Sequence, residues 1–309
     1  MSKMADLERA SQPILLWGST GAMTEAVLAR LLAAGVAVTG LVLPGDDTPA
    51  PRPLPPSPPA HDELPLLDAF VQRSAVHLAW AQGLPVYTVG RLNRPGVAAW
   101  LAEQAPAAVL VACFPRRIPA ALLAIPARGF LNLHPSRLPA YRGPAPLFWQ
   151  LRDDVQPLSV TLHWMDADLD TGDIAAQADL LRPDGATGPE LDTRLGALGG
   201  DLAAQALAAG LSTRTPQLPG GSYQSWPSDA DFSLELAWSA RRAYNFMRAT
   251  AEWGRPYWLT AQGQSWRVAR ALGWDGGAKL SAPVVYQDGI MRIRFNPGSV
   301  SAIGTASAP

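Results

Sequence analysis

One stretch near the start of the chain constrains the fold more than any other. In PILLWGSTGAMTEAVLARLLAAGVAVTGLVLP, an apolar run at residues 14–17 leads into a turn at residues 18–21. An alanine- and leucine-rich helix then leads to a second apolar run at residues 36–43. Strand, turn, helix and strand in this order build parallel sheets that are covered by helices. The sequence therefore predicts an α/β fold with a mostly parallel sheet.

Two further apolar runs extend this sheet and bring polar residues to one of its edges. PAAVLVACF at residues 106–114 and GFLNLH at residues 129–134 have the length and composition of buried strands, and RPGVAAWLAEQA has the pattern of a helix. Sheets of this kind bind ligands beyond the carboxyl ends of their strands. Asn132, His134 and the pair Cys113 and Phe114 are all expected at that edge.

The remaining sequence divides into recognisable segments. Seven of the eleven residues from 49 to 59 are proline, which predicts a stiff surface segment. ATGPELDTRLGALGGDLAAQALAAG, at residues 186–210, predicts a long helix. We expect a catalytic domain over residues 13–212 and a linker over residues 213–222. A small, mainly β domain, described as OB-like, is expected over residues 223–296, with a hairpin around an Asp-Gly turn and a flexible tail over residues 297–309.

Composition excludes several classes of protein. A hydrophobic content of 48% and a charged content of 17% describe a globular, core-forming chain. The net charge of −1 gives no general attraction for nucleic acid. Four histidines and one cysteine lack the spacing of a zinc site, so no metal is expected. No apolar run approaches membrane-spanning length and the N-terminus lacks the pattern of a signal peptide, so a cytoplasmic protein without membrane contact is expected.

Asn132 and His134 form the first candidate for chemistry. Side chains alternate along a strand, so these two residues point to the same side. An amide and an imidazole that face one cavity can bind a carbonyl oxygen as it becomes an oxyanion, and the imidazole can move a proton near neutral pH. On the residues alone, the spacing favours the other interpretation, a hydrogen-bonded histidine at a packed corner.

The second candidate is HWMDADLDTGDI, at residues 163–174, which carries four aspartates in eight residues. Such a run is commonly a solvated or cation-binding loop, but the spacing does not match a calcium-binding EF-hand. A carboxylate that this loop brings beside His134 would raise the pKa of the imidazole and could relay a proton through water.

These motifs together resemble the folate-dependent formyltransferase family. Its members include methionyl-tRNA formyltransferase, glycinamide ribonucleotide formyltransferase and sugar N-formyltransferases. The family pattern is Asn-x-His, Ser-Leu-Leu-Pro, a glycine and later Asp-(Thr/Ala)-Gly, and here NLHPSRLPAYRGPAP is followed by DTGD 36 residues after His134. The resemblance covers about residues 13–210 and is faint from about residue 222 onward. It implies a Rossmann-like, doubly wound sheet.

The resemblance also implies a reaction and the residues that perform it. An amine would attack the formyl carbon of 10-formyltetrahydrofolate, and Asn132 with a protonated His134 would stabilise the resulting oxyanion. Asp170 would hold the imidazolium and accept the amine's proton, through an ordered water. The residues placed around the pterin head of the folate are Phe114, Pro115, Arg116, Arg117, Ile118, Asp166 and Leu169.

The acceptor is open to more than one interpretation. Arg137 stands where the family has an apolar residue, either as a solvent-facing substitution or as an anion hook for the acceptor. Thr20, in the first turn, is a second candidate contact. The segment at residues 44–65 carries one arginine and four acidic residues where the tRNA enzymes have a basic loop, and the chain from residue 222 onward has nine basic and six acidic residues.

We therefore expect a small amine acceptor, such as an amino sugar nucleotide or a hydroxyornithine-type amine. Methionyl-tRNA is the alternative, and a local patch of arginines keeps it open. A non-catalytic folate-binding protein and a 10-formyltetrahydrofolate hydrolase are alternatives of another class. A nucleotide-binding oxidoreductase is disfavoured because GSTGAM does not match Gly-x-Gly-x-x-Gly.

Overall fold

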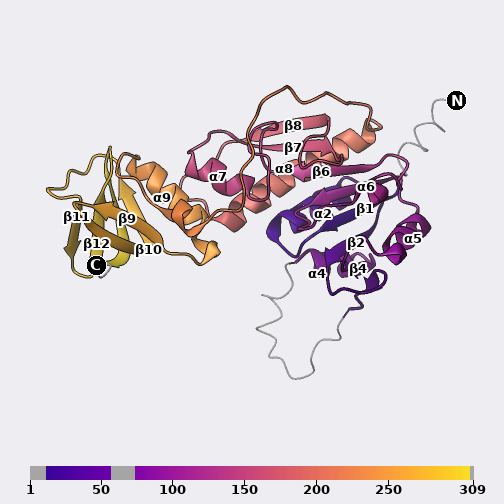
Figure 1. Ribbon diagram of the computed structural model, residues 1–309, viewed down its shortest axis with the longest axis horizontal. Coiled ribbons are helices and arrows are strands. Elements are labelled where there is room, and N and C mark those ends of the chain that lie inside the picture. Colours follow the sequence, from indigo (N-terminus) through magenta and orange to yellow (C-terminus); the bar gives the residue numbers. More distant parts are fainter. Residues whose placement is uncertain (1–11, 57–73, 307–309) are drawn as a thin grey trace, which may run out of the picture. The chain divides into compact units, whose positions relative to one another are not determined.

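The strand, helix and strand predicted near the N-terminus are present in the computed structural model, which describes residues 12–56 and 74–306 (Figure 1). β1 (Ile14–Gly18) is followed by α2 (Ala22–Ala33) and β2 (Val38–Pro44), and β1 pairs with β2 in parallel. All five residues of β1 are buried because the strand lies inside the sheet with neighbours on both sides. Residues 1–11 and the part of the proline-rich segment beyond residue 56 lie outside the described residues.

An eight-stranded sheet forms the centre of the first of two compact units, in the order β3-β4-β2-β1-β5-β6-β7-β8. The further strands are β3 (Arg52–Pro53), β4 (Val86–Val89), β5 (Ala108–Ala112), β6 (Phe130–His134), β7 (Leu158–Trp164) and β8 (Ile174–Leu180). The five strands from β4 to β6 are parallel, whereas β3, β7 and β8 run antiparallel to their neighbours. From β1 the chain first adds β2 and β4 on one side of that strand. It then returns to add β5 and β6 on the other side. The mostly parallel, doubly wound sheet is confirmed, with its switch point between β1 and β5.

Helices cover both faces of this sheet because successive strand residues face opposite sides. Leu16 packs with residues of α2, α4 (Ala75–Ala81) and α8 (Gly188–Ala208), whereas Leu15 and Trp17 pack with residues of α5 (Pro95–Gln104) and α6 (Ala120–Leu123). The long helix predicted over residues 186–210 is thus confirmed as α8.

Two glycines of α8 allow that helix to approach α2 closely. A Cβ atom on Gly196 would lie 2.6 Å from the carbonyl oxygen of Met23, and one on Gly200 would lie 3.1 Å from that of Val27. Backbone atoms cannot move aside as a flexible side chain can. The glycines are therefore required by packing, in spite of their unfavourable helix propensity.

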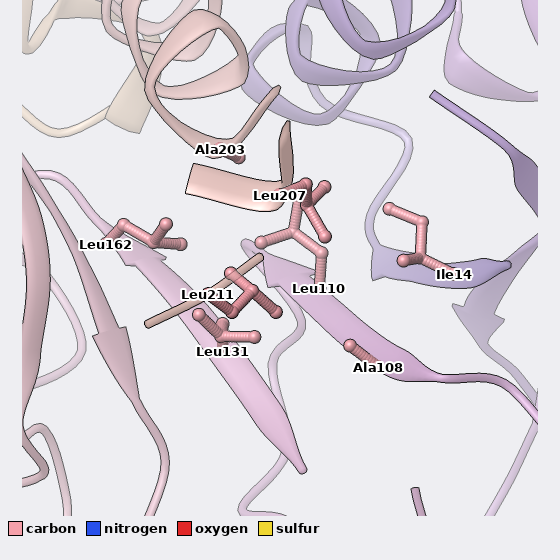
Figure 2. A pocket seen from close by; sticks show the side chains of 8 residues that line it. All are labelled: Ile14, Ala108, Leu110, Leu131, Leu162, Ala203, Leu207 and Leu211. Atoms are coloured by element: carbon pink, nitrogen blue, oxygen red, sulfur yellow. The ribbon is translucent and has the colours of Figure 1, made fainter. Parts of the chain in front are cut away.

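A small cavity lies in the core between the sheet and α8 (Figure 2). Eight aliphatic side chains line it, and its volume is about 10 Å³. A water molecule needs about 10–15 Å³ and two to four polar partners, and this lining offers no polar side chain. The cavity is a packing defect and not a ligand site.

The second compact unit comprises residues 147–157, residues 181–191 and the chain from residue 224 onward. Its five-stranded antiparallel sheet has the order β11-β12-β13-β10-β9. Its helices are α7 (Pro146–Arg152, of which residues 147–152 belong to this unit), α9 (Ala240–Ala249) and the short 3-10 helices at Asp229–Phe232 and Ala251–Trp253. Its strands are β9 (Tyr257–Ala261), β10 (Gln264–Asp275), β11 (Val284–Gln287), β12 (Ile290–Arg294) and β13 (Ser299–Ala306). A mainly β C-terminal domain is confirmed, and its OB-like description stays a prediction.

The hairpin of this unit forms as expected. β11 and β12 pair through Gln287 and Ile290, and the connecting residues Asp288 and Gly289 both have positive φ, at 53° and 74°. Two successive residues with positive φ are the geometry of a tight turn whose twist matches that of the strands.

The end of the chain differs from the expected flexible tail. Residues 299–306 form β13, which lies between β12 and β10 in the middle of the sheet. Val300, Ala302 and Gly304 alternate as its buried residues. Because two of these three residues are small, the alternation of hydrophobic residues that marks a strand is weak here. Residues 307–309 lie outside the described residues.

No helix in the described parts of the chain combines the length and the apolar character that crossing a membrane requires.

Candidate active site

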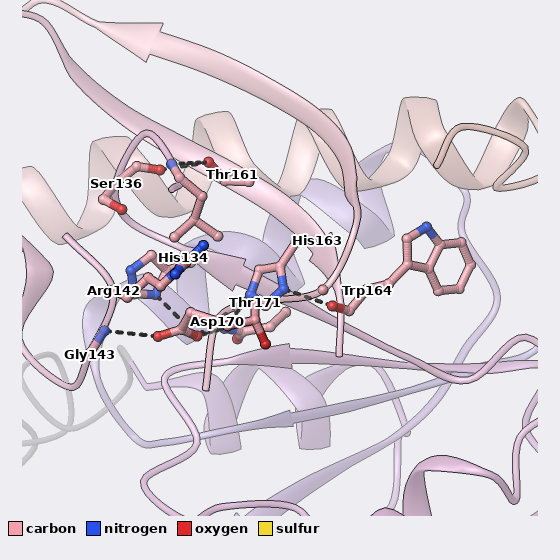
Figure 3. A network of polar contacts seen from close by, with 12 residues as sticks. His134, Ser136, Arg142, Gly143, Thr161, His163, Trp164, Asp170 and Thr171 are labelled. Carbon is pink, nitrogen blue, oxygen red and sulfur yellow. Dashed lines mark hydrogen bonds and ion pairs between the residues drawn. The ribbon is translucent and has the colours of Figure 1, made fainter. Parts of the chain in front are cut away.

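Asn132 and His134 lie on β6, at the carboxyl end of the parallel strands, and as alternate residues of one strand they face the same side. Figure 3 shows His134 with Asp170 and His163 close by. His134 is 4% exposed. β6 pairs with β7 in an antiparallel register that places Asn132 opposite His163 and His134 opposite Thr161. Thr161 supports the turn after His134, because its hydroxyl donates to the Ser136 carbonyl oxygen at 2.7 Å. The strand thus ends in a fixed turn that leaves the imidazole beside the sheet edge.

Asp170, in the loop between β7 and β8, joins this pair. It is 6% exposed, and its Oδ1 lies 3.6 Å from His134 Nδ1. Its Oδ2 accepts a hydrogen bond from the Gly143 N–H at 2.9 Å. Its backbone adopts φ of 57°, a left-handed conformation that is uncommon outside glycine. The three residues predicted from the sequence therefore converge, and a backbone N–H from the loop after His134 completes the cluster.

His163 belongs to the same cluster and was not singled out in the sequence. It is 1% exposed, and its Nδ1 donates to the Trp164 carbonyl oxygen at 2.8 Å. In that tautomer Nε2 is an acceptor, and it lies 3.2 Å from the amide nitrogen of Asn132. The same amide nitrogen lies 3.5 Å from Asp170 Oδ1. Only the antiparallel register of β6 and β7, which the sequence pattern does not fix, places His163 there.

The second ring nitrogen of His134 also has a partner. Nε2 lies 2.8 Å from the Tyr141 carbonyl oxygen, so it carries the proton and donates. In the neutral ring, Nδ1 is then unprotonated and faces Asp170. The geometry prepares Nδ1 to receive a proton beside a carboxylate.

Asp170 is ionised in this environment. Burial opposes its charge, but the neighbouring His163 and His134 rings and the hydrogen bond from the Gly143 N–H together outweigh burial, and the pKa of Asp170 is lowered. The site therefore holds one buried negative charge.

Asp170 raises the pKa of His134, as the sequence-based argument expected, but burial has the larger and opposite effect. Burial disfavours the imidazolium more than Asp170 and the Tyr141 carbonyl favour it, so the pKa of His134 is lowered. The distance of 3.6 Å between Nδ1 and Oδ1 is too long for a strong charge-assisted hydrogen bond. The lowered pKa favours a neutral imidazole near pH 7 before the reaction begins.

The loop predicted to hold the pterin head follows β5. Phe114 contacts the Trp17 ring with centroids 5.2 Å apart, and Ile118 is 3% exposed within the apolar cluster on this face of the sheet. Arg116 donates to the carbonyl oxygens of Val89, Gly90 and Gly45. Its guanidinium therefore ties together the ends of neighbouring strands. Pro115 is exposed in the same loop.

The second predicted cofactor segment is the loop before Asp170. Asp166 closes it by accepting hydrogen bonds from the Thr171 hydroxyl at 2.8 Å and the Asp168 N–H at 3.1 Å. Arg117, from the loop after β5, donates to the Ala167 carbonyl oxygen. The two predicted cofactor loops are thus joined directly, and the second of them carries Asp170. Leu169 is 44% exposed, which leaves an apolar side chain available to a planar ring.

The two candidate acceptor contacts lie in the turns that follow β6 and β1. Arg137 pairs with Asp179 of β8 at 2.6 Å, and both side chains are largely solvent-exposed. Thr20 is exposed in the turn after β1, where Ser19 and Thr24 make the hydrogen bonds. Thr24 also donates to the Ala112 carbonyl oxygen at 2.9 Å, which fixes the turn against the end of β5.

Within residues 12–56 and 74–306, no group of three or more His, Cys, Asp or Glu side chains is arranged to hold a metal ion. The cluster offers instead an amide donor, a neutral imidazole with a free acceptor nitrogen, and an ionised carboxylate. This set can hold a carbonyl oxygen and accept a proton from a neighbouring nucleophile.

Comparison with known proteins shows that the part of the chain that carries this cluster is similar to formyltransferases. Residues 69–207 match the family model described as formyl transferase, and this segment contains Asn132, His134 and Asp170. The methionyl-tRNA formyltransferase of Synechococcus sp. (strain JA-3-3Ab) is 35% identical over 200 residues, which are 63% of this chain and 61% of that protein. The match likewise covers less than two thirds of the next two methionyl-tRNA formyltransferases.

Solved structures share the fold at low sequence identity. The N-formyltransferase from Helicobacter canadensis, in complex with folinic acid and dTDP-3-aminofucose, is 14% identical with a TM-score of 0.59, covering 96% of this chain and 100% of that one. HypX from Aquifex aeolicus, in complex with tetrahydrofolic acid, is 14% identical with a TM-score of 0.55, covering 96% of this chain and 46% of that one. The resemblance to the formyltransferase family is confirmed.

Proposed function

We propose that this chain, which resembles the formyltransferases in sequence and fold, transfers a formyl group from 10-formyltetrahydrofolate to an amine. The observation that carries the proposal is the convergence of Asn132, His134 and Asp170 at the carboxyl edge of the sheet. A buried carboxylate that faces a neutral imidazole is costly to maintain, and ionisable groups held in such environments cluster at functional sites.

The folate would lie between the two joined loops. Phe114 and Leu169 offer apolar surface for the pterin, and the Arg117 bond to Ala167 holds the loops together. When bound there, 10-formyltetrahydrofolate supplies the formyl group. Arg116 acts in this account as a support of the loop, because three carbonyl oxygens already occupy its guanidinium.

Each catalytic residue has a distinct role. The Asn132 bond to Asp170 is long at 3.5 Å, so this N–H is the one that can turn to a substrate oxygen. His134 Nδ1 accepts the proton that the attacking amine loses and returns it to N10 of the folate as the bond from N10 to the formyl carbon breaks, while Nε2 stays bonded to Tyr141. Asp170 stabilises the imidazolium formed in that step. A single well-placed donor to a developing oxyanion contributes roughly 3–4 kcal/mol in other enzymes.

A small amine remains the proposed acceptor. The chain has a net charge of −1, and its segment after β2 lacks the basic residues that bind phosphates. The Helicobacter canadensis protein, whose fold matches over its whole length, was solved with an amino sugar nucleotide. The likeness in fold to that protein supports the proposal of a small acceptor.

A specific observation favours methionyl-tRNA as the second candidate. The strands β9 to β13 carry four exposed arginines and, at the end of β10, one aspartate; the arginines are Arg267, Arg270, Arg292 and Arg294. Arg267 lies opposite the exposed Trp258 in the sheet. Arginines interleaved with an aromatic ring suit a nucleic acid strand. In the first unit, Asp47 of the acidic segment after β2 pairs with Arg91 and Arg94, which weakens the repulsion of phosphates expected from that segment.

A direct assay tests the function and its alternatives. The purified protein would be mixed with 10-formyltetrahydrofolate and either a panel of amines or charged methionyl-tRNA, with tetrahydrofolate release and product mass followed together. We expect a formylated small amine. Folate binding without turnover would support the non-catalytic alternative, and formate release without an amine would support the hydrolase. A rate tenfold higher with methionyl-tRNA would reverse the ranking of acceptors.

A further inference from the structure

The segment predicted as a linker runs along the two loops that build the catalytic cluster. At its start, Thr215 exchanges two backbone hydrogen bonds with Ile174, at 2.8 and 2.9 Å. The guanidinium of Arg214, the residue before Thr215, lies over the Trp164 ring, 3.7 Å from the ring centroid. Residues 192–223 form part of the first compact unit together with the cluster. The segment is therefore anchored beside the Asp170 loop.

Gln217 connects the two loops through its side chain. Its Nε2 donates to the carbonyl oxygens of Asp170 at 2.9 Å and Gly172 at 2.8 Å. Its Oε1 accepts a hydrogen bond from Arg142 at 2.9 Å. Asp170 and Arg142 belong to loops that approach His134 from opposite sides, so one amide group fixes the distance between these loops.

Ser222 holds the other loop. Its hydroxyl oxygen accepts from the Tyr141 N–H at 2.9 Å, its N–H donates to the Pro139 carbonyl oxygen at 3.2 Å, and its carbonyl oxygen accepts from the Arg142 N–H at 2.9 Å. A Cβ atom on Gly221 would lie 2.2 Å from the Pro139 carbonyl oxygen, so only glycine permits this approach.

Both residues that contact His134 need such support. Tyr141, whose carbonyl accepts from His134 Nε2, has φ of 58°, and Asp170, which faces Nδ1, has φ of 57°. Residues with side chains occupy this left-handed region at a cost, and they persist there when surrounding contacts determine their conformation. The surrounding contacts here come from Ser222 for Tyr141 and from Gln217 for Asp170.

We propose that residues 215–222 form a strap that positions both partners of His134, with Gln217 and Ser222 as positioning residues. The inference rests on the proposed function, since it assigns these residues to that reaction. Neither side chain touches the reacting atoms in this account. Their effect passes through the placement of Tyr141 and Asp170.

Three variants separate positioning from a general effect on folding. Gln217→Glu keeps the size of the side chain and its acceptor for Arg142, but it removes both N–H donors to Asp170 and Gly172. Ser222→Ala removes one acceptor and is the milder change. Gln205→Glu makes the same chemical change at an exposed position of α8 and serves as the matched control.

Two readouts apply to the full-length chain. Hydrogen exchange reports the loops directly, because the Gly143 amide is bonded to the Asp170 carboxylate. In Gln217→Glu we expect this amide to exchange at least tenfold faster. Steady-state kinetics should show kcat reduced about 10- to 100-fold, as expected for a misplaced catalytic group, with KM for 10-formyltetrahydrofolate changed less than threefold. Ser222→Ala should show smaller changes in the same directions, and Gln205→Glu should match the wild type.

The acid limb of the pH–rate profile is a third readout that a purely structural role would not move. In Ser222→Ala, which adds no charge, a displaced Tyr141 carbonyl supports the imidazolium less, so the limb should shift to lower pH. Unchanged exchange at Gly143 would overturn the strap. Faster exchange with kcat within threefold of the wild type would overturn the positioning role. If the wild type forms no product with any acceptor, the proposed function fails, while the exchange measurement still decides whether the strap holds the loops.

Discussion

His134 is held between two partners that make different demands on its ring. Tyr141 fixes the proton on Nε2, and Asp170 faces the unprotonated Nδ1. Burial keeps the resting ring neutral although a carboxylate lies 3.6 Å away. A neutral acceptor nitrogen beside an ionised group suits the removal of a proton from an amine, whose attack requires that proton to leave.

Substitutions in this cluster should abolish most of the activity. We expect His134→Gln and Asp170→Asn each to lower kcat at least about a hundredfold, because each removes a group that handles the proton. His77→Gln, on α4 and bonded to Ser74, makes the same change away from the cluster and should retain kcat within about twofold. A near-normal kcat in either cluster variant would exclude the role given to that residue.

The pH dependence of the rate follows from the lowered pKa of His134. Its neutral form is the active one, so kcat/KM should fall as the pH falls, with a midpoint below the ordinary value of 6.5. Asp170 stays ionised throughout this range because its own pKa is lowered from 3.8. A limb centred above 6.5 would mean that Asp170 dominates over burial.

Stability should depend on pH through the same two groups. In both, the pKa is lower in the folded than in the unfolded chain, so the unfolded chain binds the proton first as the pH falls. The contribution of His134 is complete above about 6.5 and decreases below it; that of Asp170 decreases only below about 3.8. Thermal unfolding between pH 7 and 5 should show declining stability, with a slope of at most about 1.4 kcal/mol per pH unit from His134. In His134→Gln this part of the slope should disappear.

Among the elements, α8 shows how packing overrides local propensity. Replacing a helical glycine by alanine ordinarily stabilises a helix by about 1 kcal/mol. Gly196→Ala should instead lower the free energy of unfolding by about 1–3 kcal/mol, because the new Cβ would lie 2.6 Å from the Met23 carbonyl oxygen. Ala29→Gly, at an exposed position inside α2, should cost only the propensity difference of about 1 kcal/mol. Urea unfolding of both variants measures the contrast, and a stabilised Gly196→Ala variant would contradict it.

Elements with a clear hydrophobic period could be predicted from the sequence, and others could not. The alternation in β6 predicts that Asn132 and His134 share a side, and that is how they lie. His163 depends on the register between β6 and β7, which many long-range contacts determine together. Residues 213–222 are rich in glycine and proline, so they resemble a linker, and their hydrogen bonds to two distant loops leave no periodic pattern.

At the scale of the whole molecule, the first unit was easier to predict than the second. Long apolar strands and helices mark the parallel sheet, whereas β13 consists largely of small residues and resembles a frayed end. The choice of acceptor is likewise a property of the whole surface. The net charge of −1 is small, but the arginines gather on the strands of the second unit.

Salt dependence should separate the two acceptor classes. For a small amine, KM should change less than about threefold between 50 and 200 mM salt, since few ions are released on binding. A tRNA held by 6–10 phosphate contacts would lose roughly 10³–10⁵ in affinity over this range. The substitution Arg270→Ala, in β10, removes one of the exposed arginines and should leave KM for a small amine unchanged. A steep salt dependence that this substitution reduces would favour tRNA.

The central claim is that the cluster around His134 moves a formyl group from 10-formyltetrahydrofolate to an amine. Single-turnover reactions with the isotopically labelled donor, analysed by mass spectrometry, test it most directly. We predict that the labelled formyl group appears on the amine in stoichiometric amounts with the wild-type protein, and at least a hundredfold more slowly with His134→Gln. Labelled formate in place of formylamine, or equal rates for both proteins, would contradict the account.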